Sequence, residues 1–169
     1  MSARPAEADR QLNFGYGANL DGSVYDRCPD AIDLGNARLP DHRWLATSAG
    51  VATVVRHPRG VVHGVLWSLS AQDLENLDRF EALELGFYRR ERHEVITDAG
   101  ERVRAWVYFA NQPQAGEPIP LYLAAIVEAA RQRRFPTEYI AKLQAWGSLS
   151  TGGEAGRRRH WQDIFDTPR

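Results

Sequence analysis

The sequence predicts an α+β domain that combines a curved sheet or small β-barrel with helices. Two observations predict this class. Short segments rich in β-branched and aromatic residues alternate with turn residues up to about residue 110, and amphipathic helical patterns occur after residue 70 and again after residue 120. Short strands linked by hairpins favour closure of the sheet, because closure removes exposed strand edges.

Five strands account for the β pattern. The first is the alternating segment 12–14, which leads into a glycine-flanked loop. The other four form two predicted antiparallel pairs, each with turn residues between its members. These pairs are 44–55 with 61–69, joined by residues 57–60, and 87–97 with 102–110, joined by residues 98–101.

Three helices are predicted from capping residues and apolar spacing. Ser70 and Asp73 resemble a capping box, so the first helix is expected to run to about Ala82. The second covers residues 121–134 and ends in arginines, which complement the helix dipole. The third begins after Pro136 and is expected to end at Gly147.

Composition indicates one globular domain. The chain has 169 residues, of which 43% are hydrophobic and 25% charged. We predict a disordered leader over residues 1–10, a folded domain over 11–147 and a polar tail over 148–169 whose packing is uncertain.

Charge and cysteine content exclude several classes of protein. A formal net charge of -1 gives no overall field that favours nucleic acid or an anionic membrane. No apolar run approaches the roughly 20 residues that span a bilayer. Cys28 is the sole cysteine, which excludes an internal disulfide and is compatible with a reducing compartment. We therefore predict a cytoplasmic protein with neither nucleic-acid nor membrane partners.

A loop with two glycines is the first candidate binding element. Gly15 and Gly17 bracket Tyr16 directly after the first strand. Glycine can take a positive φ and can expose main-chain N–H groups to an anionic or carbonyl ligand. A tight turn or bulge is the alternative interpretation of the same residues.

Glu81 is the second candidate, because it completes the helical stripe that also contains Leu74, Leu77 and Asp78. A carboxylate directed toward the sheet is costly unless it is paired, neutral or functional. One interpretation pairs it with one of the nearby arginines, such as Arg79, Arg89 or Arg90. The other leaves it unpaired, so that desolvation raises its pKa toward neutrality and it acts as a general acid and base.

Other chemistries have weaker support. Cys28 with His57, His63 or His93 lacks a nucleophile signature, and the histidines lack metal-ligand spacing. No metal is predicted. Gly15 and Gly17 lack the third glycine of a dinucleotide fingerprint.

Several motifs together resemble the γ-glutamylcyclotransferase family. They occur in the family's order over most of residues 12–146: Phe14-Gly15-Tyr16-Gly17-Ala18-Asn19-Leu20, His63-Gly64-Val65-Leu66-Trp67-Ser68-Leu69, Leu77-Asp78-Arg79-Phe80-Glu81 and Gly86-Phe87-Tyr88. The resemblance implies a small mixed β-barrel with flanking helices and a substrate cavity at the tyrosine-glycine loop. It also implies cyclisation of a γ-glutamyl amide to 5-oxoproline, with release of the amine or amino acid and with no metal or organic cofactor.

The resemblance assigns a role to individual residues. Glu81 falls on the family's catalytic glutamate, and the expected substrate-binding residues are Tyr16, Gly17, Ala18, Asn19, Leu20, Tyr88 and Tyr122. Two positions depart from the family pattern, since Ala18 replaces a serine and Ala82 stands where glycine commonly follows the glutamate.

Two other functions stay open. One is a non-catalytic module that binds a γ-glutamyl group or related amide, and the other is a specialised γ-glutamylamine cyclotransferase of a biosynthetic pathway. The expected partner is a small-molecule substrate, and a homodimer is a candidate assembly.

Overall fold

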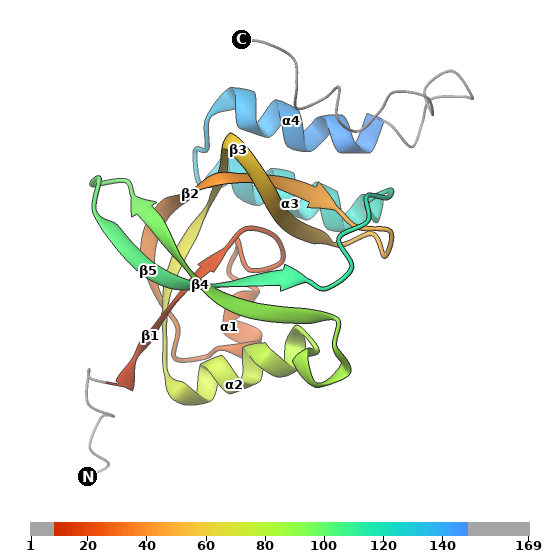
Figure 1. Cartoon of the computed structure of the whole chain (residues 1–169). Coiled ribbons are helices and arrows are strands. Elements are labelled where there is room, and N and C mark those ends of the chain that lie inside the picture. Colours follow the sequence, from red (N-terminus) through yellow and green to blue (C-terminus); the bar gives the residue numbers. More distant parts are fainter. Residues whose placement is uncertain (1–8, 149–169) are drawn as a thin grey trace.

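The computed structural model describes residues 9–148, and its strands form a closed barrel (Figure 1). The barrel order is β1-β3-β2-β4-β5, which confirms the predicted fold class. The ring closes where β1 pairs in parallel with β5, at Asn13 opposite Trp106. The strands are β1 (Gln11–Gly15), β2 (Ile32–Ala46), β3 (Ala52–Leu69), β4 (Tyr88–Thr97) and β5 (Arg102–Ala110).

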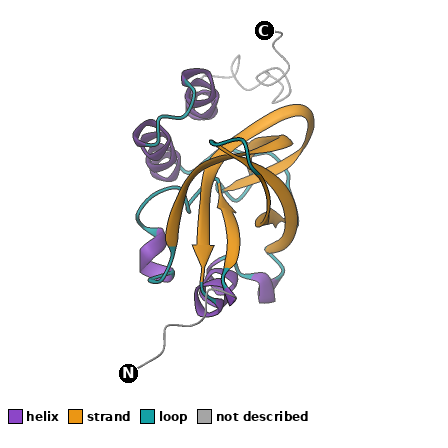
Figure 2. Cartoon of the chain, turned by 90° about the vertical axis from the view of Figure 1, so that its left-hand side faces the viewer, coloured by secondary structure: helices purple, strands orange, loops and turns teal. Residues whose placement is uncertain are grey.

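Helices cover two regions of the barrel. In Figures 1 and 2, α3 and α4 lie together beside one end of the barrel, while α1 and α2 lie at the other end. The core is dominated by aromatic and aliphatic side chains that the barrel and helices bury together, including Phe14, Trp44, Trp67, Leu77 and Trp146. The helical elements are α1 (Val24–Arg27), α2 (Ala71–Phe80), η2 (Leu83–Leu85), α3 (Pro120–Gln132) and α4 (Thr137–Ser148).

Two local predictions are confirmed where local chemistry decides the structure. The β4–β5 hairpin pairs in register from Tyr88 opposite Ala110 to Ile96 opposite Arg102. At the start of α2, Ser70 Oγ accepts a hydrogen bond from the Asp73 N–H, and the Asp73 carboxylate accepts one from the Ser70 N–H. This reciprocal capping box satisfies main-chain donors that a helix end leaves free.

The predicted hairpin between residues 44–55 and 61–69 is wrong in its turn. The chain reverses earlier, between β2 and β3, where the Thr47 N–H donates to the Val51 carbonyl. Residues 57–60 instead lie inside β3. The turn preference of these residues produces a register shift in the pairing of β2 with β3, where Asp41 and Arg59 have φ of 59° and 65°. A long two-strand ladder therefore overrides a local turn signal.

Two helix ends also differ from the prediction. α2 ends at Phe80, and Glu81 is its C-cap residue with φ −81° and ψ 1°. Ala82 then takes the left-handed conformation, with φ 53° and ψ 46°. α4 continues through Gly147 to Ser148. Glu81 is thus presented from a helix end rather than from a helical face.

The conformation of Ala82 gives a stability prediction. A left-handed alanine is strained because its Cβ crowds the following carbonyl, a cost of roughly 1–2 kcal/mol that glycine avoids. We expect Ala82→Gly to raise the free energy of unfolding by about 1 kcal/mol, measured by urea denaturation. An unchanged or lower value would contradict this strain.

The predicted tail from residue 149 onward and residues 1–8 of the predicted leader lie outside the described residues. Arg10 is described, and its Nε donates to Ser68 Oγ at 2.7 Å. Among residues 9–148, no helix is long and apolar enough to cross a membrane.

Candidate active site

A cavity of about 180 Å³ lies between the loop after β1, the end of α2 and the first turn of α3. This is room for a small metabolite group rather than a drug-sized ligand. All the predicted site residues except Leu20 line it: Tyr16, Gly17, Ala18, Asn19, Glu81, Tyr88 and Tyr122. Leu20 is 1% exposed and belongs to the core, because the chain turns back where the Leu20 N–H donates to the Gly17 carbonyl.

Glu81 carries the candidate chemistry. Glu81 is partly buried, and it lines the cavity. Its Oε1 accepts a hydrogen bond from Asn19 Nδ2 at 3.3 Å. Within residues 9–148 no arginine or lysine nitrogen lies within ion-pair distance of its carboxylate, so its ionised form has only weak compensation.

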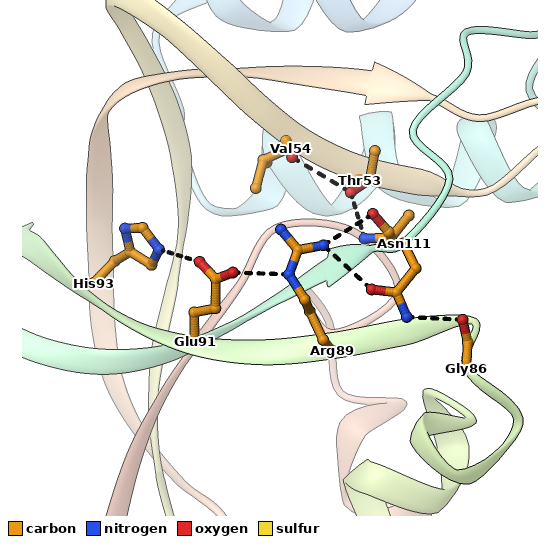
Figure 3. A network of polar contacts seen from close by, with 8 residues as sticks. Thr53, Val54, Gly86, Arg89, Glu91, His93 and Asn111 are labelled. Carbon is orange, nitrogen blue, oxygen red and sulfur yellow. Dashed lines mark hydrogen bonds and ion pairs between the residues drawn. The ribbon is translucent and has the colours of Figure 1, made fainter.

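The three arginines suggested by the sequence as partners of Glu81 form ion pairs with other carboxylates. Arg79 pairs with Glu75 at 3.7 Å, Arg89 with Glu91 at 2.8 Å and Arg90 with Asp78 at 2.9 Å. Figure 3 shows the Arg89 network, in which Glu91 also contacts His93 and Arg89 also reaches Asn111 on the outside of the barrel. The pairing interpretation of Glu81 is therefore wrong for each of these arginines.

The electrostatic environment favours a protonated Glu81 more than water does. Burial raises the pKa of Glu81 to about 7, although the nearby Arg27 charge and the Asn19 hydrogen bond act in the opposite direction. Its carboxyl group is therefore poised between its two protonation states near neutral pH. A general acid and base is most effective under that condition.

Tyrosines form much of the cavity wall. Tyr88 donates its O–H to the Ala52 carbonyl at 2.7 Å, and the Tyr122 hydroxyl oxygen accepts from the Ala52 N–H at 3.1 Å. Burial, followed by smaller contributions that include Glu81, raises the pKa of Tyr88 well above its ordinary value. These phenols stay neutral, so they shape the cavity and offer polar contacts without adding charge.

Tyr108 is a site residue that the sequence did not single out. It lines the cavity from β5, and its O–H donates to Asp78 Oδ1 at 2.7 Å. Its main-chain carbonyl accepts the Tyr16 O–H. The remaining lining residues absent from the prediction are Phe14, Gly15, Val51, Ala52 and Phe80. Tyr108 lies in a strand of aromatic and β-branched residues, where no pattern separates it from the core.

The glycines of the loop serve a purpose other than the predicted positive φ. Neither Gly15 nor Gly17 has one. A Cβ on Gly15 would lie 2.5 Å from the Asn19 carbonyl oxygen, and a Cβ on Gly17 would lie 3.0 Å from the Tyr122 hydroxyl. Gly15 therefore leaves no room for a side chain, whereas a Cβ on Gly17 would require the neighbouring atoms to move slightly.

The loop leaves donors available to a ligand. Among the described residues, the N–H groups of Gly17 and Asn19 donate to no other main-chain group. The loop is held in place because the Trp67 indole N–H donates a hydrogen bond to the Asn19 carbonyl at 2.8 Å. Fixed amides on a loop that lines the cavity suit a carboxylate or a developing oxyanion.

Ala18 also acts through its main chain. Its carbonyl accepts a hydrogen bond from Arg27 Nη2 at 2.9 Å, and the residue lines the cavity. The position thus has a main-chain contact that does not require a serine hydroxyl.

The other candidate chemistry finds no support in residues 9–148. Burial raises the pKa of the Cys28 thiol to about 11, and its Sγ contacts the Asp73 carbonyl. No group of three or more His, Cys, Asp or Glu side chains in this part of the chain could hold a metal ion.

Comparison with known proteins finds one matching family model and several relatives. The model of the AIG2-like family matches residues 61–143. A γ-glutamylcyclotransferase of Mus musculus is 29% identical over 153 residues, which are 82% of this chain and 80% of the relative. The chain is therefore similar to the AIG2-like family and to proteins named γ-glutamylcyclotransferase.

A second relative and a solved structure show the same similarity. The γ-glutamylcyclotransferase of Homo sapiens is 29% identical over 145 residues, covering 79% of this chain and 77% of the relative. A solved structure titled γ-glutamyl cyclotransferase superposes with a TM-score of 0.75 at 28% identity, covering 80% of this chain and 87% of that one.

Proposed function

We propose that this protein is a γ-glutamylcyclotransferase that converts a γ-glutamyl amide to 5-oxoproline and releases the amine or amino acid. The observation that carries the proposal is Glu81, a cavity-facing carboxyl group with a pKa raised to about 7 and no ion pair among the described residues. Curated relatives named γ-glutamylcyclotransferase support the same activity.

In the first step, the loop holds the substrate and Glu81 activates it. The N–H groups of Gly17 and Asn19 would bind the glutamyl head group, and the Glu81 carboxylate would accept a proton from the α-ammonium. The freed amine then carries the lone pair that attacks the γ-carbonyl. Holding these two groups together supplies several kcal/mol, because intramolecular reactions reach effective molarities of ~10⁵ M or more.

In the second step, the ring closes and the amide breaks. A bond forms between the α-nitrogen and the carbonyl carbon of the γ-carboxyl group, and the developing oxyanion is stabilised by fixed dipoles of the cavity. The attacking nitrogen then releases its second proton to solvent. The oxyanion re-forms the carbonyl as the bond between this carbon and the leaving nitrogen breaks, and the proton held by Glu81 passes to that nitrogen. The released amine takes up a further proton from solvent. Glu81 returns to its carboxylate form, so no co-reactant is consumed.

The pKa of Glu81 predicts the pH dependence of turnover. The first step needs the carboxylate, so we expect kcat/KM to fall as pH decreases through about 7. Measuring kcat/KM from about pH 5 to about pH 9 with a substrate whose own groups do not titrate near 7 checks this limb. A rate that stays level down to about pH 5, near the ordinary pKa of a glutamate, would contradict a base with this pKa.

A substrate panel tests the activity directly. The purified full-length protein is incubated with γ-glutamyl dipeptides, glutathione and γ-glutamylamines, and 5-oxoproline is measured. Release from any member supports the proposal, and release from one amine alone would identify a specialised enzyme. Binding of these compounds without product would instead identify a non-catalytic module.

The cellular location and the oligomeric state of the protein are also predictions. The cytoplasmic location follows from the single cysteine and from the sequence features given above. The homodimer is a candidate assembly, which light scattering of the purified protein tests.

A further inference from the structure

We propose that Arg27 is a positioning residue for Glu81 and acts through the side-chain amide of Asn19. This inference rests on the proposed function for its consequence in turnover. Arg27 Nε and Nη2 donate to Asn19 Oδ1 at 3.0 Å and 2.6 Å, and Asn19 Nδ2 donates to Glu81 Oε1 at 3.3 Å. Three side chains from α1, the loop after β1 and the end of α2 thus form one chain of hydrogen bonds.

The polarity of this chain fixes the orientation of the amide. A guanidinium only donates hydrogen bonds, so the end of Asn19 that faces Arg27 must be the oxygen. The amide nitrogen must then face Glu81 and donate to its carboxyl group. Asn19 is 5% exposed, so solvent does not compete freely for either end. Without Arg27, the amide could rotate and present its oxygen to the carboxylate, which is repulsive.

Arg27 is itself held rigidly enough to perform this task. Its Nη2 also donates to the Ala18 carbonyl at 2.9 Å, and its Nη1 donates to the Ser23 carbonyl at 3.2 Å. The guanidinium carbon lies 3.9 Å from the centre of the Phe80 ring, and Phe80 directly precedes Glu81. Arg27 therefore joins the substrate loop to the helix end that presents Glu81.

Arg27 also supplies the positive charge that Glu81 feels most among the described residues. The other titratable groups that interact with Glu81 are tyrosines: Tyr16 after β1, Tyr88 on β4, Tyr108 on β5 and Tyr122 on α3. Burial raises the pKa of each of these phenols, so they stay neutral. The Arg27 charge lowers the pKa of Glu81 against the larger effect of burial. Removing Arg27 should thus make the carboxylate harder to form.

Two variants separate orientation from charge. Arg27→Met removes both the charge and the donors, whereas Arg27→Lys keeps the charge without the planar fork that contacts Asn19 through two nitrogens. Arg131→Met is the matched control, since it removes an equal charge at an exposed position of α3 whose ion partner is Glu128. Thermal unfolding of each variant establishes that the fold is kept.

The first measurement needs no substrate. In protein carrying ¹³C-labelled glutamate, the Glu81 carboxyl signal is assigned by its loss in Glu81→Gln and then titrated. We expect its midpoint to rise by about half a unit to one unit in Arg27→Met, to stay near wild type in Arg27→Lys and to be unchanged in Arg131→Met.

The second measurement is turnover of a γ-glutamyl dipeptide as a function of pH. We expect kcat near pH 7 to fall about tenfold in Arg27→Met, with partial recovery at higher pH and with little change in KM. In Arg27→Lys, kcat should stay reduced at every pH, because the charge remains but the amide is less well oriented.

Two outcomes would overturn the inference. One is a Glu81 midpoint in Arg27→Met equal to that of wild type, and the other is wild-type turnover in Arg27→Lys at every pH. If Arg27→Met does not fold, turnover in Arg27→Lys still decides. If the wild-type protein releases no 5-oxoproline yet the titration shifts as expected, the proposed function fails while the link between Arg27 and Glu81 stands.

Discussion

Glu81→Gln is expected to lower kcat by about 10²-fold or more while the protein keeps its fold and still binds a γ-glutamyl ligand. Glutamine has nearly the same shape and can still accept the Asn19 hydrogen bond through its side-chain oxygen, but it cannot take the ammonium proton. The rate of 5-oxoproline release gives kcat, and calorimetry measures whether the affinity for the γ-glutamyl ligand is kept. Undiminished product release would remove Glu81 from the mechanism.

Glu84→Gln is the matched control, because Glu84 is exposed three positions further along the chain and does not line the cavity. Its kcat should equal that of wild type. Any loss shared by both variants would indicate a general effect of removing a carboxylate.

Glu81→Gln should also stabilise the protein at neutral and alkaline pH. The folded-state pKa of about 7 lies above the ordinary 4.5, so the folded chain binds the Glu81 proton more tightly than the unfolded chain does. The protonated Glu81 therefore makes its full contribution to the free energy of unfolding below about pH 4.5, and this contribution is lost as pH rises to about 7. Glu81→Gln should thus gain roughly 2 to 3 kcal/mol over wild type at about pH 8 and little at about pH 4. Urea denaturation at the two pH values measures this difference.

Gly15→Ala is expected to reduce both stability and activity. The added Cβ would lie 2.5 Å from the Asn19 carbonyl oxygen and 2.9 Å from the Asn19 Cβ, so the loop must move. That carbonyl accepts the Trp67 indole hydrogen bond, and the Asn19 side chain contacts Glu81. We expect a loss of about 1–3 kcal/mol in the free energy of unfolding and at least about tenfold in kcat/KM.

Gly22→Ala provides the comparison within the same stretch of chain. No atom lies within 4 Å of a Cβ at Gly22, and its φ is not positive. Its stability should stay within about 0.5 kcal/mol of wild type, with kcat/KM unchanged. Equal losses in the two variants would show that alanine at any loop glycine is harmful, and the close approach at Gly15 would not be the cause.

Local chemistry explains which parts of the fold were predictable. The β4–β5 hairpin has its turn residues directly between two β-rich segments, and the capping box of α2 spans four consecutive residues. The turn at residues 57–60 was misplaced because fifteen-residue β2 pairs with β3 along most of its length, and this pairing outweighs a local preference. Glu81 was expected to face the sheet from a helix, whereas the left-handed Ala82 ends the helix at Phe80 and the carboxylate faces the cavity from the C-cap.

Patterns among neighbouring residues were enough to predict the fold class, the motif that holds Glu81 and the loop that contains Asn19. The folded chain was needed to show that none of Arg79, Arg89 and Arg90 pairs with Glu81, that Tyr108 lines the cavity and that Arg27 reaches Glu81 through Asn19. The contact that builds the site joins Asn19 and Glu81 across a separation of 62 positions. It forms when closure of the barrel brings the loop after β1 against the end of α2, and no periodicity or local motif encodes it.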